Sequence, residues 1–380
     1  MPLMQVTVTR RELLRVVQHC QGVADKKSTM PVLGNVLLDV SGLDSLRVAA
    51  TDLNLAVSAK LGAQVGKGGS IAVPARDLFE RLKMMPEGPI TIASEGTGAT
   101  IRAAGSARRY TLHGIPGDEF PAIPQPDAAA TFLAIGAEAL GTLMARTHFS
   151  ISTDDTRVHL NSALFEWDGN RVRMVTTDGH RLSKMELEVP GRPATATMLI
   201  PLKGIHELRR LCDEAKSEAR GEERAPEIGL VQSGPSAFFR LPGLLFSVKV
   251  VDAQFPPYQQ VIPQGAERTV AVPRAALADA LRAVKLAASD RTGGVKLSLS
   301  RGTMRFSSES PDAGEGFDEI SVDYQGPDVT IGFNAQYFLD VLASFDDERV
   351  EVRIGGELDP VVLAPEGSPE YVAVIMPMRI

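Results

Sequence analysis

The run Thr177-Asp178-Gly179-His180-Arg181-Leu182 places a carboxylate and an imidazole close together in the chain. In a hydrolase, Asp178 could orient His180 so that the imidazole acts as a general base. The structural alternative is a turn between two antiparallel strands, for which Asp-Gly is a favoured pair. No nucleophile or metal ligand is evident nearby in the sequence. We therefore interpret the run as a turn that presents a binding surface, and we predict no catalytic residues.

Two other possible sites, a phosphate-binding loop and a cysteine metal site, do not match the required sequence patterns. Residues 62–68, GAQVGKG, resemble a phosphate-binding loop, but they place three residues between the first two glycines where that loop has four. Gly68 also stands where that loop has the Ser or Thr that binds Mg²⁺. Cys20 and Cys212 match no metal-ligand spacing and are expected to be buried, reduced thiols. We predict neither a metal nor a cofactor.

The elements that carry these residues are repeated along the chain. The pair Thr177-Asp178 has a counterpart in Thr51-Asp52, which no histidine follows. One strand–helix phrase occurs at residues 6–20, 132–144 and 270–284, and a second at 73–78, 200–205 and 333–338. Both phrases keep a spacing of roughly 130 residues, which predicts three homologous domains of two strand–helix units each. We place these domains at residues 1–127, 128–264 and 265–380.

Short alternating segments and amphipathic segments together predict an α+β fold. The strand patterns cover residues 35–40, 46–50, 55–59, 91–93, 100–103, 109–112, 162–167, 172–176, 183–189 and 371–380. The helical patterns cover residues 10–20, 75–85, 137–148, 202–216, 274–289 and 335–345. Short strands joined by Gly and Asp turns predict antiparallel sheets. The charged residues 215–227 are expected to form a mobile loop.

Composition indicates an ordinary globular protein. Of its 380 residues, 44% are hydrophobic and 23% charged, and the length favours two to three domains. The first residues lack the apolar centre of a signal peptide, and no apolar run is long enough to span a bilayer. We therefore expect a cytoplasmic protein without a membrane partner.

The charge is unevenly distributed between the helical segments and the rest of the chain. A formal net charge of −7 by itself disfavours a protein that holds nucleic acid by neutralising phosphates. However, the six helical segments taken together are net basic, so the rest of the chain is more acidic than the total. Basic helix faces are often only solvated surface. Here Arg11 and Arg15 lie opposite the apolar stripe of the first helix, which favours helices that face an anion.

The chain resembles the bacterial DNA polymerase III β subunit, the sliding clamp family, over its whole length. The motifs that carry the resemblance are residues 177–182, residues 30–35 (MPVLGN), Phe255-Pro256 before Tyr258, and the last five residues, MPMRI. The resemblance implies a DNA clamp fold, in which sheets form the outside of a ring and helices line its hole. It also implies a head-to-tail homodimer around duplex DNA, with basic helices toward the phosphates and an acidic exterior.

The resemblance further implies a processivity factor, an accessory subunit without catalysis of its own. The implied partners are duplex DNA bound without sequence specificity, the DNA polymerase III α subunit, the clamp loader, and other polymerases and repair proteins with Leu/Phe clamp-binding motifs. Such proteins dock in a pocket between the second and third domains. Matched by motif, the pocket residues are Leu160, Thr177, Gly179, His180, Arg181, Leu182, Pro256, Val261, Val374, Met376, Pro377, Met378 and Arg379.

The same resemblance assigns candidate residues for DNA and for the dimer. Lys27 matches a basic loop residue of the family, and Arg15, Arg76 and Lys203 are candidates on the helices. The dimer contact would join Tyr110 of one protomer to the region of Leu286 in its partner.

Two regions depart from the family pattern. Val158 and His159 stand where relatives can carry DNA-facing tyrosines, and they follow Asp154-Asp155, so we leave that loop off the DNA contacts. Ala287 and Thr292 are smaller than the apolar residues that relatives can have at the dimer contact. Two alternatives stay open at this point: a repeat scaffold that binds only proteins, and a hydrolase that uses Asp178 and His180.

Overall fold

The computed structural model describes residues 4–25, 27–191, 193–221, 226–265, 267–289 and 293–379. The chain folds into two compact units, residues 1–140 with 206–250 and residues 141–205 with 251–380. Sheets that join neighbouring repeats explain this grouping, because β4 (Leu55–Gly62) pairs with β18 (Leu244–Lys249), and β14 (Arg181–Glu188) pairs with β26 (Tyr371–Ile375). The predicted domain boundaries at residues 127 and 264 follow the sequence repeats. They do not coincide with the boundaries of the two compact units.

The first unit contains two sheets, in which every pairing of the described strands is antiparallel. The smaller sheet has the order β5 (Gln64–Lys67), β1 (Met4–Thr9), β7 (Pro89–Glu95), β8 (Gly98–Ala103), β9 (Arg109–His113). The larger one has the order β10 (Ile115–Pro116), β6 (Gly69–Pro74), β2 (Asn35–Val40), β3 (Ser45–Thr51), β4, β18, β17 (Ser236–Leu241), β16 (Glu227–Ser233), β11 (Leu133–Gly136). The segment that resembled a phosphate loop lies in β4 and β5, with no helix after it, so its rejection holds.

The second unit repeats this plan with antiparallel strands throughout its described part. Its larger sheet has the order β15 (Ala194–Pro201), β12 (Ser162–Gly169), β13 (Arg171–Thr177), β14, β26, β25 (Val361–Pro365), β24 (Arg349–Ile354), β19 (Arg268–Pro273). Its smaller sheet has the order β22 (Gly314–Ser321), β21 (Thr303–Ser310), β20 (Gly294–Ser300), β23 (Val329–Asn334).

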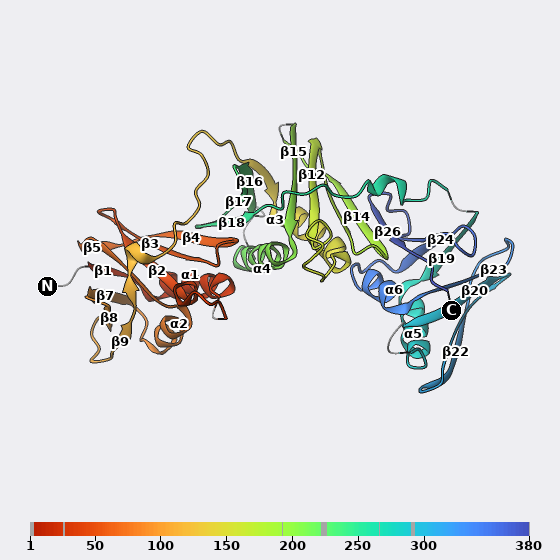
Figure 1. Cartoon of the computed structure of the whole chain (residues 1–380), viewed down its shortest axis with the longest axis horizontal. Coiled ribbons are helices and arrows are strands. Elements are labelled where there is room, and N and C mark those ends of the chain that lie inside the picture. Colours follow the sequence, from red (N-terminus) through yellow and green to blue (C-terminus); the bar gives the residue numbers. More distant parts are fainter. Residues whose placement is uncertain are drawn as a thin grey trace. The chain divides into compact units, whose positions relative to one another are not determined.

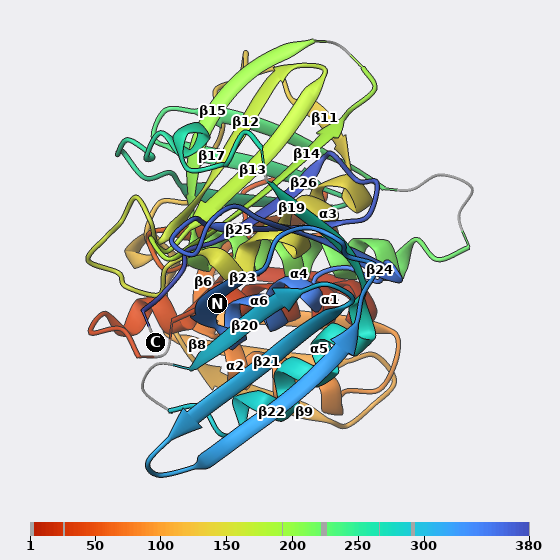
Figure 2. The same ribbon diagram turned by 90° about the vertical axis from the view of Figure 1, so that its right-hand side faces the viewer.

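The described helices follow strand ends, as the repeated phrases predict. They are α1 (Arg10–Val23), α2 (Ala75–Met84), α3 (Ala137–Thr147), α4 (Leu202–Glu218), α5 (Arg274–Lys285) and α6 (Ala335–Leu342). In the first unit, α1 lies against β3 and β4 and beside α2 (Figure 1). In the second, α5 packs on β21 and β22 (Figure 2) and beside α6. Among the residues that the structure describes, no helix combines the length and apolarity needed to cross a lipid bilayer.

Several predicted boundaries differ from the structure, and the helices predicted to end at residues 289 and 345 end at Lys285 and Leu342. The last strand ends at Ile375 instead of continuing through residue 380, because Pro377 has no backbone N–H to donate to a ladder. The segment after it is held by single hydrogen bonds: Met376 N donates to His180 O (2.9 Å), and Met378 N donates to Gly332 O (2.8 Å). The predicted loop at residues 215–227 is helical as far as Glu218, while residues 222–225 lie outside the described residues.

Both cysteines lie in the core of the first unit. Cys20 and Cys212 are fully buried, each on the inner face of a helix. Burial raises the pKa of the Cys20 thiol and raises that of Cys212 from 9.0 to about 12. A raised thiol pKa lowers the thiolate fraction at neutral pH, so these groups are poor nucleophiles in the folded state.

We expect thiol reagents to leave the native protein unmodified. At pH 8 the pKa shift of Cys212 lowers its thiolate fraction by roughly 1000-fold relative to an exposed cysteine, before access is considered. Labelling with a chromogenic disulfide should therefore be slow in the native protein and complete for both thiols in guanidinium chloride. Labelling of either thiol at the unfolded rate under native conditions would contradict the burial described here.

Candidate functional site

The run singled out by its chemistry forms the turn between β13 and β14, as interpreted. One carboxylate oxygen of Asp178 accepts the backbone N–H groups of His180 (2.9 Å) and Arg181 (3.1 Å). The hydroxyl of Thr177 donates to the carbonyl of Arg181 (2.6 Å), and Gly179 has a φ of 94°, which favours glycine. The group of His180 that contacts Asp178 is thus its backbone N–H, and the His180 residue is exposed. This geometry does not form the Asp–His pair of a hydrolase.

The first unit contains a second copy of this turn, at Thr51-Asp52-Leu53-Asn54-Leu55. Asp52 accepts the N–H groups of Asn54 (2.9 Å) and Leu55 (2.6 Å), and the Thr51 hydroxyl donates to the carbonyl of Leu55 (2.8 Å). Leu53 takes the place of Gly179 and, with a φ of 75°, is the one residue other than glycine with a positive φ in the described ranges. The Thr-Asp pair therefore belongs to the turn in both copies. What distinguishes the second copy is the set of side chains around it.

A cavity of about 220 Å³ opens beside the second copy. It is lined by His159, Leu160, Thr177, Gly179, Arg181, Leu182, Pro256, Tyr258, Val261, Val374 and Met376. Buried apolar side chains support it from below, including Leu164, Val175 and Val362. The pairing of β14 with β26 sets Leu182 opposite Val374, which brings the turn and the end of the chain to one cavity.

Most of the predicted pocket residues meet at this cavity. His180, Pro377, Met378 and Arg379 do not line it, although Met376 N donates to the carbonyl of His180. His159 and Tyr258 line it and were not predicted. Tyr258 is 4% exposed and its hydroxyl donates to Glu166 Oε2 (3.1 Å), while burial raises its pKa. A second hollow of about 510 Å³ shares Val261 and Met376 with the cavity.

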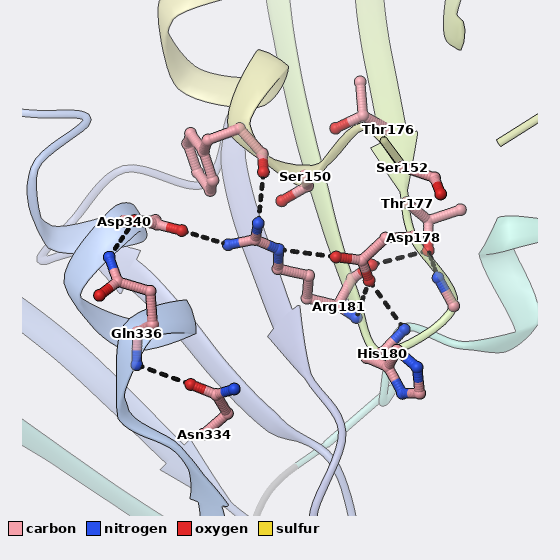
Figure 3. Close-up of polar contacts among 12 residues, drawn as sticks. Ser150, Ser152, Thr176, Thr177, Asp178, His180, Arg181, Asn334, Gln336 and Asp340 are labelled. Atoms are coloured by element: carbon pink, nitrogen blue, oxygen red, sulfur yellow. Dashed lines mark hydrogen bonds and ion pairs between the residues drawn. The ribbon is translucent and has the colours of Figure 1, made fainter. Parts of the chain in front are cut away.

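Arg181 is held on all three guanidinium nitrogens. Its Nε donates to Asp178 (3.0 Å), Nη1 to Asp340 on α6 (2.6 Å) and Nη2 to the carbonyl of Phe149 (2.5 Å). The group lies over the ring of Tyr337, 4.5 Å from its centroid. Figure 3 shows Arg181 between the two carboxylates, one from the turn and one from the helix. Arg181 therefore joins the turn to α6.

A hollow in the first unit is a weaker candidate for a binding site. It has a volume of about 980 Å³ and is lined by charges of both signs from α1 and α4. Two pairs of these side chains contact each other: Arg15 Nη1 lies 2.9 Å from Glu218, and His19 Nδ1 lies 2.9 Å from Glu214. The apolar cavity beside Arg181 is therefore the stronger candidate site.

The remaining predicted residues are spread over both units. Lys27 and Arg76 are exposed, and Arg15 is partly exposed and paired with Glu218 in the first unit. Lys203 is exposed at the start of α4. Tyr110 lies on β9, and Leu286, which is 83% exposed, follows α5. Ala287 is buried, and Thr292 lies outside the described residues.

Comparison with known proteins gives one consistent result. Models of the N-terminal, central and C-terminal domains of the DNA polymerase III beta subunit match residues 4–124, 134–257 and 259–379. The beta sliding clamp of Caulobacter vibrioides is 30% identical over 383 residues, which cover 99% of this chain and 100% of that protein.

Solved structures agree. The crystal structure of the DNA polymerase III subunit beta from Pseudomonas aeruginosa superposes with a TM-score of 0.90 at 31% identity, covering 99% of this chain and 100% of that one. A structure of the Pseudomonas aeruginosa sliding clamp bound to griselimycin superposes with a TM-score of 0.89 at the same identity and coverage. The three predicted repeats and the clamp fold are thereby confirmed. The chain belongs to the DNA polymerase III beta subunit family, the beta sliding clamps, which are non-catalytic processivity factors of that polymerase.

Proposed function

We propose that the chain closes into a homodimeric ring around duplex DNA and tethers the polymerase through the cavity beside Arg181. The observation that carries the proposal is this cavity, which the turn after β13 and the end of β26 form together in a chain matched over its full length by sliding clamps. The proposed partners are the DNA polymerase III α subunit, the clamp loader, and other polymerases and repair proteins with Leu/Phe motifs. A Pseudomonas aeruginosa relative bound to griselimycin supports ligand binding by this family.

The chemistry of the cavity fits an apolar anchor of a partner peptide. Its walls are mostly apolar, and Met376 and Val261 lie at its rim with 39% and 40% of their surface exposed. A methionine can repack around leucine or phenylalanine, which suits a site with several partners. Four further residues are close to lining residues in the chain and would contact the partner peptide outside its anchors: His180, Pro377, Met378 and Arg379.

Contacts with DNA would be few and weak. Arg15, Lys27, Arg76 and Lys203 are the proposed phosphate contacts, and Arg15 already has Glu218 as a partner. An exposed ion pair of this kind contributes only about 0–1 kcal/mol, so a phosphate can replace Glu218 without gaining much. Asp154 binds Arg157 (2.8 Å), and this pair supports leaving that loop off the DNA contacts. The ring would then stay on the duplex because it encloses it, and strong binding to the phosphates would not be needed.

Two sheet edges support a head-to-tail dimer. β9, with Tyr110, is an end strand of the smaller sheet in the first unit, and β22 is an end strand of the smaller sheet in the second. β22 carries Phe317, which is 65% exposed, and packs on α5, which Leu286 follows. Unpaired edges with exposed apolar side chains are sites for pairing with another chain. We propose that β9 of one protomer lies against β22 of its partner.

We expect light scattering to give twice the chain mass of 40.7 kDa. Leu286→Asp should weaken the dimer by roughly 30-fold or more, because it buries a charge at the proposed contact. Leu43→Asp is the matched control, since Leu43 is 94% exposed at the turn between β2 and β3 and should leave the mass unchanged. A wild-type monomer at micromolar concentration would favour the alternative of a protein-binding scaffold that does not encircle DNA.

A further inference from the structure

Asp340 does not line the cavity, yet it holds a residue that does. Its Oδ2 accepts from Nη1 of Arg181 at 2.6 Å, and the two side chains are 25% and 12% exposed. The second carboxylate on Arg181, from Asp178, is 15% exposed. Arg181 is thus a nearly buried cation whose place depends on two acids, and only Asp340 comes from outside the turn.

The helix fixes Asp340 in turn. Gln336, one helical turn earlier on α6, donates its amide to Asp340 Oδ1 (2.6 Å), as Figure 3 shows. Lys285 on α5 binds the other end of that amide, at Gln336 Oε1. Asn334 caps α6 by accepting the N–H of Gln336 (2.8 Å). Each oxygen of the Asp340 carboxylate therefore has its own partner, Gln336 for Oδ1 and Arg181 for Oδ2. The bond from Gln336 orients the carboxylate so that Oδ2 faces Arg181.

The other copy of the turn provides an internal comparison. By the repeat, Leu55 of the first unit occupies the position of Arg181, and Glu207 on α4 occupies the position of Asp340. Glu207 is 7% exposed and pairs within its own helix, with Nε of Arg210 (3.1 Å). The acid on the helix thus occurs in both copies, but only in the copy with the cavity does it bind an arginine of the turn. This difference indicates that the pair of Arg181 and Asp340 has a role specific to the cavity.

We propose that Asp340 is a positioning residue for partner docking: it holds Arg181 against α6 and keeps the wall of the cavity in its open form. The inference rests on the proposed docking of partners in this cavity. Without Asp340, the guanidinium would keep Asp178, Phe149 and the ring of Tyr337 but lose its ion pair with α6. Arg181 would then leave its place for part of the time, and the binding-competent fraction would fall.

Binding kinetics can test this role with a fluorescein-labelled peptide that carries adjacent leucine and phenylalanine residues. We expect Asp340→Asn to lower the association rate by about 5–10-fold, as for a competent fraction of roughly 10–20%, with the dissociation rate nearly unchanged. Glu207→Gln is the matched control in the other copy and should bind like wild type. Asp340→Glu keeps the charge and should restore most of the rate, which also covers the case that Asp340→Asn fails to fold.

A double-mutant cycle tests whether Asp340 acts through Arg181. In an Arg181→Leu background, which copies Leu55, Asp340→Asn should cause no further loss. The inference would be overturned if Asp340→Asn lowered the association rate equally in both backgrounds, or if Asp340→Asn alone associated at the wild-type rate. Neither result would contradict the docking proposal, provided that the wild-type chain binds the peptide. If the wild-type chain itself did not bind the peptide, the docking proposal would fail, and this inference would fail with it.

Discussion

Deletion of residues 376–380 is expected to abolish binding of a Leu/Phe peptide while leaving a folded protein. β26 ends at Ile375, so the deletion keeps its pairing with β14 and β25. What is lost is the Met376 wall of the cavity and the backbone bonds from Met376 and Met378. Those two bonds are worth roughly 1–3 kcal/mol of stability together. Peptide affinity should fall by more than about 100-fold, because a site loses its anchor pocket when a wall is removed.

Fluorescence anisotropy and thermal melting separate the two effects. The truncated protein should melt only a few degrees below wild type, about what that free energy predicts for a domain of this size. Binding at unchanged affinity would show that the cavity is not the docking site.

A second variant reaches the same cavity without shortening the chain. Gly179→Leu copies Leu53 of the first unit, where the same turn exists with a leucine. A Cβ at Gly179 would lie 3.8 Å from Arg157 Nη1, an ordinary contact, but the φ of 94° costs about 1–2 kcal/mol for a leucine. The added side chain should obstruct the cavity and lower peptide affinity, while the hydrogen bonds of the turn remain.

Local patterns in the sequence were sufficient for most elements. β2 was predicted at residues 35–40 and occupies Asn35–Val40, because a short apolar run bounded by turn residues is a local signal of a buried strand. Helix α1 was predicted at residues 10–20 and continues to Val23. The error at the end of the chain has the same local origin: residues 371–380 are apolar enough for a strand, but Pro377 cannot join a ladder.

The cavity could be predicted only through the resemblance, since its parts are distant in the chain. Tyr258 reaches its place by a bond to Glu166, 92 positions away, and Arg181 binds Asp340, 159 positions away. Hydrophobic periodicity describes only local structure, so it cannot predict contacts that depend on how distant strands pair. The division into two compact units was equally inaccessible, because it depends on β4 meeting β18 and β14 meeting β26.

The strongest expected effect concerns DNA, where we predict that retention is topological. Several basic side chains of the helices are paired with acids, as Arg15 with Glu218, Arg81 with Asp77 and Lys83 with Glu80. A site with four phosphate contacts loses roughly 600-fold in affinity when salt rises about sixfold. A linear duplex should therefore be released at raised salt. A closed ring on a circle should stay, because leaving it requires an interface to open.

The most direct measurement is gel filtration of the protein loaded by a clamp loader onto nicked circular DNA, at about 0.3 M salt. The account predicts that the protein elutes with the circle and leaves it once a restriction enzyme has cut the circle to a linear duplex. Leu286→Asp should not be retained on either form. Equal retention of the wild-type protein on the circle and on linear DNA with free ends would contradict the ring.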